Sequence, residues 1–223
     1  MFNLLLITDR KISKRPLSHA VKAALEGGVD AVQVREKDLN SRELFEIADE
    51  LRKLTATYNA KLIINDRVDV ALAVDADGVH LGWRSMSIKK VRSLVGPEKL
   101  IGYSAHSLHE ARNAQEDGAD YITFSPIYKS RSKEVTPVGA DKIRTLEKHI
   151  KIPVIALGGI DEDNVDEVLR NGADGVAVIS SILVAENPLE AARKLRRKIE
   201  QFKNKSTNMQ GIASVVSLPY NDR

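Results

Sequence analysis

The chain alternates between short apolar runs and longer segments whose apolar residues recur at helical spacing. An uninterrupted apolar run is typical of a strand buried on both faces of a parallel sheet. Such runs predict strands at 3–8, 31–35, 61–65, 78–81, 100–104, 121–124, 152–157 and 175–179. Helical patterns follow at 17–26, 40–58, 68–74, 88–94, after 107, 141–149, 164–170 and 188–202. Eight strand–helix units in about 200 residues fit a single closed (β/α)8 TIM barrel with a parallel eight-stranded core better than an open, doubly wound sheet.

A weak repeat supports this count. Gly28-Val-Asp, Gly118-Ala-Asp and Gly172-Ala-Asp each separate a predicted helix from the next strand, and Asp75-Ala-Asp is a degenerate copy. Glycine suits the left-handed C-cap of a helix, and the small residue and Asp fill the turn. Residues 1–203 are therefore assigned to one catalytic barrel domain. Residues 204–223 show neither period and are expected to form a flexible or surface-draped extension.

Composition narrows the class. With 43% apolar and 29% charged residues, the chain is typical of a globular protein, and it has no membrane-length apolar run. Residues 1–3 lead directly into a strand pattern, so a signal peptide is not expected. A cytoplasmic location and no membrane partner are expected. The absence of cysteine excludes disulfides and thiolate chemistry. The net charge of +3 lies largely in 193–198 and 203–205, but with 4% aromatic residues a solvated helix face is favoured over nucleic-acid binding.

Two of the predicted strands end in glycine or serine. The run at 152–157 leads into Gly158-Gly159, and the run at 175–179 leads into Ser180-Ser181. Glycine lets backbone N–H groups approach a ligand closely, and an anion is favoured where a helix begins. Two such neighbouring strand ends predict a phosphate site like the one found after strands 7 and 8 of many (β/α)8 barrels.

Further polar residues lie where other predicted strands end, which is where such a barrel builds its active site. Gln33, Arg35 and Lys37 alternate along the chain, so their side chains can point to one side. They are joined by Asn65, Asp66, Ser104, His106 and the polar segment 129–133. These cations and hydroxyls suit a substrate with more than one phosphate. Asp66 could hold Mg²⁺ through one carboxylate together with substrate phosphates.

Structural alternatives exist for these residues. Gln33 or Arg35 alone could be polar filler inside the barrel, although Lys37 beside them favours a functional role. Asp66 could instead cap the helix that follows it. His106 precedes Ser107, the first residue of a predicted capping box, and could be positional rather than catalytic.

For Lys133 and His80, the residue type and position favour a structural role over a functional one. Lys133 lies in a polar loop, where a solvated lysine is the default. His80 lies inside a predicted strand and is expected to be a packed, hydrogen-bonded residue rather than a ligand.

Taken together, seven short motifs resemble the thiamin phosphate synthase family and its TenI-type relatives over about residues 3–202. The motifs are Gln33-Val-Arg-Glu-Lys-Asp38, Ile64-Asn-Asp-Arg-Val-Asp69, Asp77-Gly-Val-His-Leu-Gly82, Ser104-Ala-His-Ser107, the 130–133 loop, Ile155-Ala-Leu-Gly-Gly-Ile160 and Gly172-Ala-Asp-Gly-Val-Ala-Val178. Each motif is weak by itself, but all seven occur in the family's order.

The resemblance implies a Mg²⁺-dependent enzyme that joins hydroxymethylpyrimidine diphosphate to thiazole phosphate and releases pyrophosphate. Its implied catalytic residues are Lys133, Arg35 and His106, and Asp66 would bind the metal. The implied substrate-binding residues are Gln33, Lys37, Asn65, Ser104, Ser130, Ser132, Gly158, Gly159, Ile179 and Ser180. The partners would be these small phosphorylated molecules, and a homo-oligomer is compatible with the sequence.

One segment departs from the synthase pattern. Synthases of this family usually read Gly-Gln-Glu-Asp after strand 4, and the Asp is a second Mg²⁺ ligand, whereas this chain reads Gly82-Trp-Arg-Ser85. TenI-type relatives also lack that Asp and resemble metal-independent thiazole tautomerases in which a histidine at the place of His106 is central. A synthase is favoured, with a tautomerase or a non-catalytic thiazole phosphate binder as alternatives.

Overall fold

Eight parallel strands form a closed barrel in which each strand pairs with its neighbours in sequence and β8 pairs with β1. The computed structural model describes the backbone of residues 1–129 and 136–215, and their side chains as far as Lys205. The strands are β1 (Leu4–Ile7), β2 (Ala31–Val34), β3 (Lys61–Asn65), β4 (Gly78–Leu81), β5 (Leu100–Ala105), β6 (Tyr121–Phe124), β7 (Val154–Leu157) and β8 (Gly175–Val178). The predicted (β/α)8 fold is confirmed.

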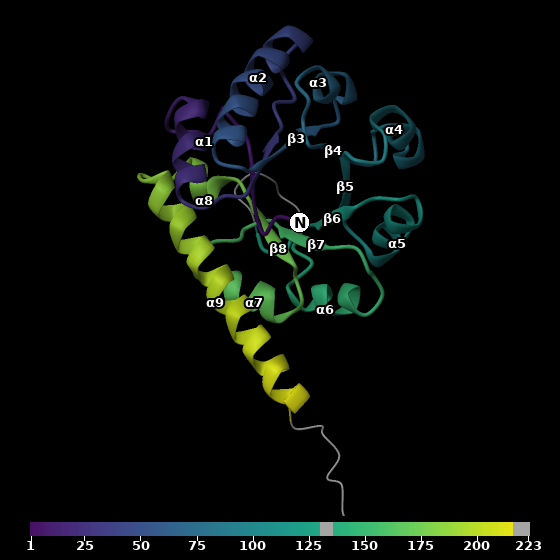
Figure 1. Cartoon of the computed structure of the whole chain (residues 1–223), viewed down its shortest axis with the longest axis vertical. Coiled ribbons are helices and arrows are strands. Elements are labelled where there is room, and N and C mark those ends of the chain that lie inside the picture. The colour runs from purple at the N-terminus through teal and green to yellow at the C-terminus, as the bar shows by residue number, and fades with distance from the viewer. Residues whose placement is uncertain (130–135, 216–223) are drawn as a thin grey trace, which may run out of the picture.

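Helices surround the barrel on its outside (Figure 1). They are α1 (Leu17–Glu26), α2 (Ser41–Thr57), α3 (Val68–Ala73), α4 (Ile88–Val95), α5 (Leu108–Glu116), α6 (Asp141–Glu147), α7 (Val165–Arg170), α8 (Ser180–Leu183) and α9 (Pro188–Val215). The short helix α8 was not predicted as a separate element. It begins directly after Ile179, at the end of β8.

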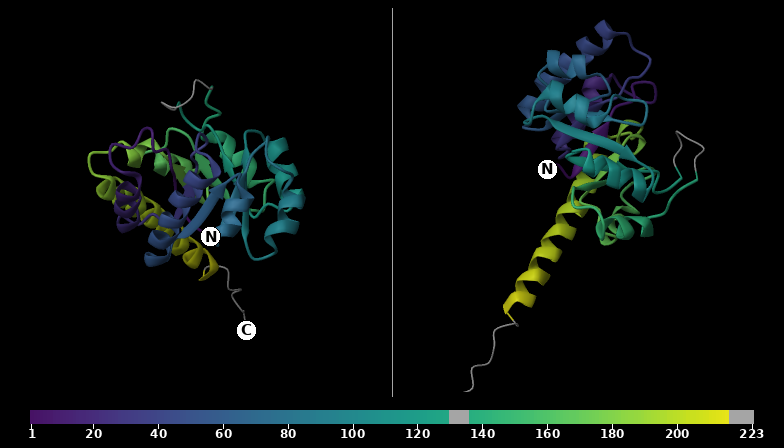
Figure 2. Two further views of the ribbon diagram at one scale, coloured as in Figure 1. Left: turned by 90° about the horizontal axis from the view of Figure 1, so that it is seen from above. Right: turned by 90° about the vertical axis from the view of Figure 1, so that its right-hand side faces the viewer.

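The last helix is longer than its sequence pattern indicated. The predicted end was near Phe202, but the helical backbone of α9 continues to Val215, so the proposed domain boundary after residue 203 falls within a continuous helix. In Figures 1 and 2 this yellow helix extends past the barrel. No proline occurs between Pro188 and Val215, so no residue type in this range forbids a helical backbone. The helical backbone thus covers 204–215, where no helix was predicted. That this segment is flexible or surface-draped stays a prediction, and residues 216–223 lie outside the described part.

Apolar side chains fill two separate spaces. The larger cluster lies between the barrel wall and the helices and includes Val32 and Val34 of β2. The smaller cluster fills the inside of the barrel and consists of Phe2, Leu5, Ile7, Ala31, Tyr121, Ile155 and Ala177. Because successive strand residues point to opposite faces, Gln33 shares the inward face with Ala31. No helix within the described ranges combines the length and apolar character needed to cross a bilayer.

The repeated aspartates at the amino ends of β2, β4, β6 and β8 have a more specific role than filling turns. In every copy the Asp amide donates to the carbonyl of a residue on the preceding strand, and the Asp carboxylate accepts the amide of that same residue. The pairs are Asp30 with Leu4 (3.2 and 2.8 Å), Asp77 with Leu62 (2.9 and 2.8 Å), Asp120 with Ile101 (2.8 and 2.7 Å) and Asp174 with Val154 (2.9 and 2.8 Å). This reciprocal bonding joins adjacent strands at the base of the barrel.

Candidate active site

The barrel interior near the carboxyl ends of the strands is polar on the side formed by β2 to β6. Inward-facing positions on these strands, or just after them, carry Gln33, Arg35, Asn65, His80, Ser104, His106, Thr123 and Ser125. The opposite side, formed by β7, β8 and β1, is lined by apolar residues such as Leu157 and Ala177. Because the carboxyl ends of parallel strands meet at one end of a barrel, residues far apart in sequence converge there.

Gln33 lies deep in this polar region. Its side chain is only 1% exposed, and its Nε2 donates to Oδ1 of Asn65 at 3.4 Å. Its Oε1 is buried and has no hydrogen-bond partner among the described residues. A buried acceptor without a partner costs free energy, which a ligand donor would recover. The structure thus brings Gln33 and Asn65 together, as the positions at the strand ends predicted.

Arg35 and Lys37 follow Gln33 along the end of β2. The Arg35 side chain is half-buried, and its amide donates to Thr8 Oγ1 at 2.9 Å, whereas Lys37 is exposed. Burial lowers the pKa of the His80 imidazole, and the positive charge of Arg35 lowers it further. By the alternation along the end of β2, Arg35 shares the inward face with Gln33.

Glu36, between these two cations, has a structural role that the sequence reading missed. Its carboxylate is buried and accepts the Arg10 amide at 3.1 Å and the Arg10 guanidinium at 3.2 Å. The same guanidinium donates to Asp38 and holds the pKa of the Asp38 carboxyl well below its usual range. These bonds tie the loop after β1 to the loop after β2 and so hold the segment that carries Arg35 and Lys37. The sequence held one sign of this role: Glu36 is out of phase with Gln33, Arg35 and Lys37, so its side chain points to the opposite face.

Asp66 stands at the end of β3 in a left-handed conformation, with φ of 66°. Its amide donates to the carbonyl of His80 at 2.9 Å, and its exposed carboxylate accepts no hydrogen bond from the described residues. The capping alternative is wrong, because Arg67 is the N-cap of α3 and makes no side-chain cap. No cluster of three or more metal-ligating side chains occurs in the described ranges. A single open carboxylate fits Mg²⁺ only together with water and substrate oxygens.

His80 is at the centre of a buried hydrogen-bond network and is 3% exposed. Its Nδ1 lies 3.1 Å from Tyr121 Oη, while its Nε2 lies 2.9 Å from Ser104 Oγ and 3.3 Å from Thr123 Oγ1. Burial, and secondarily the charge of Arg35, lowers the pKa of His80 to about 3, so the ring is neutral. The prediction of a packed, hydrogen-bonded histidine is confirmed, and Ser104 lies against it.

His106 is exposed at the end of β5. Its Nδ1 is 2.7 Å from the backbone oxygen of Ser125, and because a carbonyl only accepts, Nδ1 carries the proton. In the neutral ring, Nε2 then bears the lone pair. The predicted capping box is half present: Ser107 Oγ accepts the Glu110 amide at 3.1 Å, but the Glu110 carboxylate accepts from the His106 amide rather than from Ser107.

The two glycines after β7 allow a close approach of the loop after β6. Gly158 and Gly159 have φ of 107° and 64°. A Cβ on Gly159 would lie 2.7 Å from the Lys129 carbonyl oxygen, and one on Gly158 would lie 2.9 Å from Pro126 Cα. A side chain at either position would therefore displace the loop.

The ends of β7 and β8 are also tied to each other. Ser181 Oγ donates to the Ile160 carbonyl at 2.8 Å, and Asn164 Nδ2 donates to the Gly159 carbonyl at 2.8 Å. Ser180 and Ser181 form the first turn of α8, where backbone N–H groups have no acceptor within the helix. The predicted phosphate-binding positions thus lie on neighbouring strands, β7 and β8, with amides available to an anion.

The segment after β4 forms a tight turn. Ser85 Oγ accepts the Gly82 amide at 2.9 Å, and the Ser85 amide donates to the Gly82 carbonyl at 2.9 Å. Trp83 is 75% exposed, and the Arg84 guanidinium lies 4.5 Å from its ring centre. Ser85 is thus a turn residue and offers no carboxylate to a metal. Ser130, Ser132 and Lys133 lie outside the described residues.

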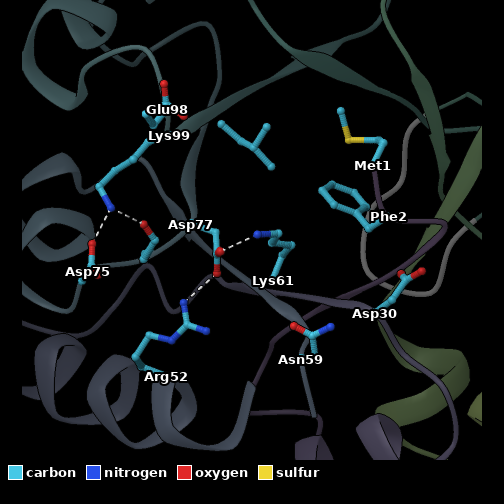
Figure 3. Close-up of a pocket in the computed structure, with 12 residues that line it drawn as sticks. Met1, Phe2, Asp30, Arg52, Asn59, Lys61, Asp75, Asp77, Glu98 and Lys99 are labelled. Atoms are coloured by element: carbon cyan, nitrogen blue, oxygen red, sulfur yellow. Dashed lines mark hydrogen bonds and ion pairs between the residues drawn. The ribbon is translucent and has the colours of Figure 1, made fainter. Parts of the chain in front are cut away.

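A cavity at the opposite end of the barrel is shown in Figure 3. Its volume is about 580 Å³, and residues before the strands line it, among them Phe2, Asp30 and Asp77. The Asp77 carboxylate pairs with Arg52 at 2.6 Å and with Lys61 at 2.8 Å, and it also accepts the Leu62 amide. These groups are used in closing the barrel base. A second cavity of about 400 Å³ lies beside His106, at the carboxyl end.

Comparison with known proteins decides the family. The family model described as thiamine monophosphate synthase matches residues 4–182. The chain belongs to this thiamine monophosphate synthase family. The resemblance noted in the sequence is thereby confirmed.

Individual members of the thiamine monophosphate synthase family match most of the chain. It is 50% identical over 197 residues to a putative thiamine-phosphate synthase of Geobacter sulfurreducens, covering 87% of this chain and 92% of the relative. It is 43% identical over 194 residues to a thiamine-phosphate synthase of Clostridium acetobutylicum, covering 86% and 92%. The structure of a thiamine phosphate pyrophosphorylase from Pyrococcus furiosus superimposes with a TM-score of 0.84 at 42% identity, covering 90% of this chain and 96% of that one.

Proposed function

We propose that this chain is a thiamin phosphate synthase, which joins hydroxymethylpyrimidine diphosphate to thiazole phosphate and releases pyrophosphate. Family membership and the names of the relatives support the reaction class. The observation that carries the proposal is the buried Oε1 of Gln33, which has no partner among the described residues and lies on the strand that leads to Arg35 and Lys37. Such a site suits a ligand with a donor-bearing ring and an anionic group.

The pyrimidine diphosphate would lie along the end of β2. Gln33, with Asn65 beside it, would bind the ring, since a carboxamide can accept from a ring amino group. Arg35 and Lys37 would bind the diphosphate, and Arg35 is better suited to a planar, two-point contact with its oxygens. As the bond to the diphosphate breaks, negative charge grows on the leaving group, and fixed cations then stabilise the transition state more than the substrate.

A magnesium ion would be held by Asp66 together with diphosphate oxygens and water, because the described residues hold no cluster of three or more metal-ligating side chains. Bound Mg²⁺ would neutralise charge on the leaving pyrophosphate. Ser130, Ser132 and Lys133 would reach the same pyrophosphate, as the resemblance implies.

The thiazole phosphate would occupy the ends of β7 and β8. Backbone amides of Gly158 and Gly159 would contact phosphate oxygens, and Ile179 and Ser180 would complete the site from β8. Both substrates then lie at the carboxyl end of the same barrel, where the thiazole nitrogen can bond to the pyrimidine carbon that loses pyrophosphate. Both are small molecules of the cytoplasm, where we expect the enzyme to act.

The deciding experiment is a turnover assay of the full chain with both substrates, in Mg²⁺ and in EDTA. Thiamin phosphate formed only with Mg²⁺ is the expected result. Product formed equally in EDTA would contradict the role of Asp66, and no product in either condition would contradict the synthase.

Metal-independent thiazole tautomerisation is the second candidate. The observation that favours it is the bond from His106 Nδ1 to the Ser125 carbonyl, which leaves Nε2 as a base at the carboxyl end. Incubation with the unaromatised thiazole phosphate in EDTA tests it. Conversion that is lost in His106→Ala would support the tautomerase, and conversion retained by that variant would remove His106 from it.

A further inference from the structure

A continuous hydrogen-bonded path runs through the barrel interior towards the site. Tyr121 Oη lies 3.1 Å from His80 Nδ1, and the opposite ring nitrogen of His80 lies 2.9 Å from Ser104 Oγ. The three residues come from β6, β4 and β5. Tyr121 and His80 are almost wholly buried, whereas Ser104 is only partly so. Ser104 is therefore the member of the path that a ligand can reach.

The surrounding residues are shaped to hold Tyr121 and His80 together. Gly102 opposes His80 across the β4–β5 pair. A Cβ at Gly102 would lie 2.4 Å from Tyr121 Oη and 2.5 Å from His80 Nδ1. At the amino ends of the strands, the Phe2 ring packs edge-on against Tyr121, with 5.0 Å between ring centroids. The absent side chain and the packed ring leave the phenol little freedom except to face the imidazole.

We propose that His80, held by Tyr121, is a positioning residue that fixes the hydroxyl of Ser104 for contact with the pyrimidine substrate. This inference rests on the proposed synthase function and on the substrate-binding role that the family resemblance implies for Ser104. It gives His80 a role in the reaction although it does not touch the substrate.

The physical reason is the freedom of a serine hydroxyl. A serine Oγ can occupy three staggered rotamers, and its hydrogen can rotate, so an isolated serine pays entropy when it bonds a ligand. A bond to a buried imidazole that is itself fixed at its other nitrogen removes this freedom before the substrate arrives. Preorganised groups of this kind lose less free energy on binding and in the transition state.

The test is a double-mutant cycle built on Tyr121→Phe, which removes one oxygen but keeps the ring packed on Phe2. We expect kcat/KM for the pyrimidine substrate to fall roughly 3- to 10-fold in this variant, in the range of measured couplings between contacting residues. In a Ser104→Ala background the same substitution should change kcat/KM less than about 2-fold. His80→Gln, whose amide can replace one ring nitrogen, should lose activity in the Ser104 background only.

Tyr103→Phe is the matched control. Tyr103 lies on β5 next to Ser104 but packs with the cluster outside the barrel. Removing its hydroxyl should leave kcat/KM unchanged. Urea unfolding of each variant shows whether it is folded, and a folded Tyr121→Phe chain suffices for the test even if His80→Gln does not fold.

Turnover by the wild type distinguishes a failure of the synthase function from a failure of the positioning role of His80. If the wild type makes no thiamin phosphate, the proposed function fails, and the positioning role fails with it. If the wild type is active but Tyr121→Phe is unchanged, or its loss is equal in both backgrounds, the positioning role is overturned while the synthase stands. A loss of kcat/KM in Tyr121→Phe that disappears in the Ser104→Ala background would establish the positioning role of His80.

Discussion

The Asp120 carboxylate accepts the amide of Ile101 at 2.7 Å, while the Asp120 amide donates to the Ile101 carbonyl at 2.8 Å. The same carboxylate also accepts from Arg92 at 2.6 Å. One side chain thus accepts from the amide of the second residue of β5 and from a guanidinium. This pairing, repeated at four aspartates, closes the barrel at the end opposite the candidate site.

Removing that carboxylate should destabilise the barrel without touching its chemistry. Asp120→Ala leaves the Ile101 amide and the Arg92 guanidinium without their acceptor, so the free energy of unfolding should fall by about 2 kcal/mol. Asp49→Ala is the control, because Asp49 lies within α2 and makes a partly exposed i,i+4 pair with Lys53. It should change the free energy by less than about 0.5 kcal/mol. Equal losses in urea titrations of the two variants would contradict a special role for the reciprocal pair.

Gly159→Ala should weaken thiazole phosphate binding. The substitution strains a φ of 64° and also places a Cβ 2.7 Å from the Lys129 carbonyl, so the loop after β6 must move. Gly96→Ala is the matched control, since Gly96 has a φ of 78° but no atom within 4 Å of the added Cβ. Both variants should lose about 1 kcal/mol from backbone strain. Only Gly159→Ala should raise the Kd for thiazole phosphate in calorimetry, and an unchanged Kd would remove this turn from the site.

Asp66→Asn should weaken magnesium binding. The variant keeps the size of the side chain but removes the single charge offered to the ion, so the Mg²⁺ concentration for half-maximal turnover should rise by about tenfold or more. Calorimetric titration of Mg²⁺ in the presence of pyrophosphate gives a readout that does not depend on turnover. Asp69→Asn serves as the control because the Asp69 carboxylate is bonded to Arg67. A similar shift in both variants would indicate a general effect of charge.

His80 should make the fold sensitive to acid. Its folded pKa of about 3 lies below the ordinary value of 6.5, so below pH 6.5 the unfolded chain binds a proton that the folded chain does not. Stability is then retained above pH 6.5 and falls as the pH drops towards 3. The loss from this group should be about 2 kcal/mol between pH 7 and pH 5.

His80→Asn should remove that part of the pH dependence, which urea unfolding at the two pH values measures. His19→Asn, at an exposed position on α1, controls for the loss of an imidazole elsewhere. The same slope in wild type and His80→Asn would show that His80 is not held neutral by burial.

The sequence by itself determined the barrel and much of the candidate site. Strands of a parallel barrel are buried on both faces and therefore read as apolar runs, so all eight were visible without tertiary information. Once eight units are counted, the carboxyl ends of the strands must meet, and Gln33 and Asn65 are brought within hydrogen-bond distance as a consequence. Family motifs then supplied the chemistry.

Other features depended on contacts that no local pattern records. Whether Asp66 caps α3 depended on where that helix begins, and the burial of Glu36 required its partner Arg10 from another loop. The length of α9 was not predicted, because beyond residue 202 the sequence shows no helical spacing of apolar residues. The absence of proline permits a helix there but does not predict one.

The bonds of His80 to Tyr121 and Ser104 join residues 41 and 24 positions away along the chain. Only closure of the barrel brings such residues together, because a strand pattern tells which face a side chain occupies but not which side chain on another strand it will meet.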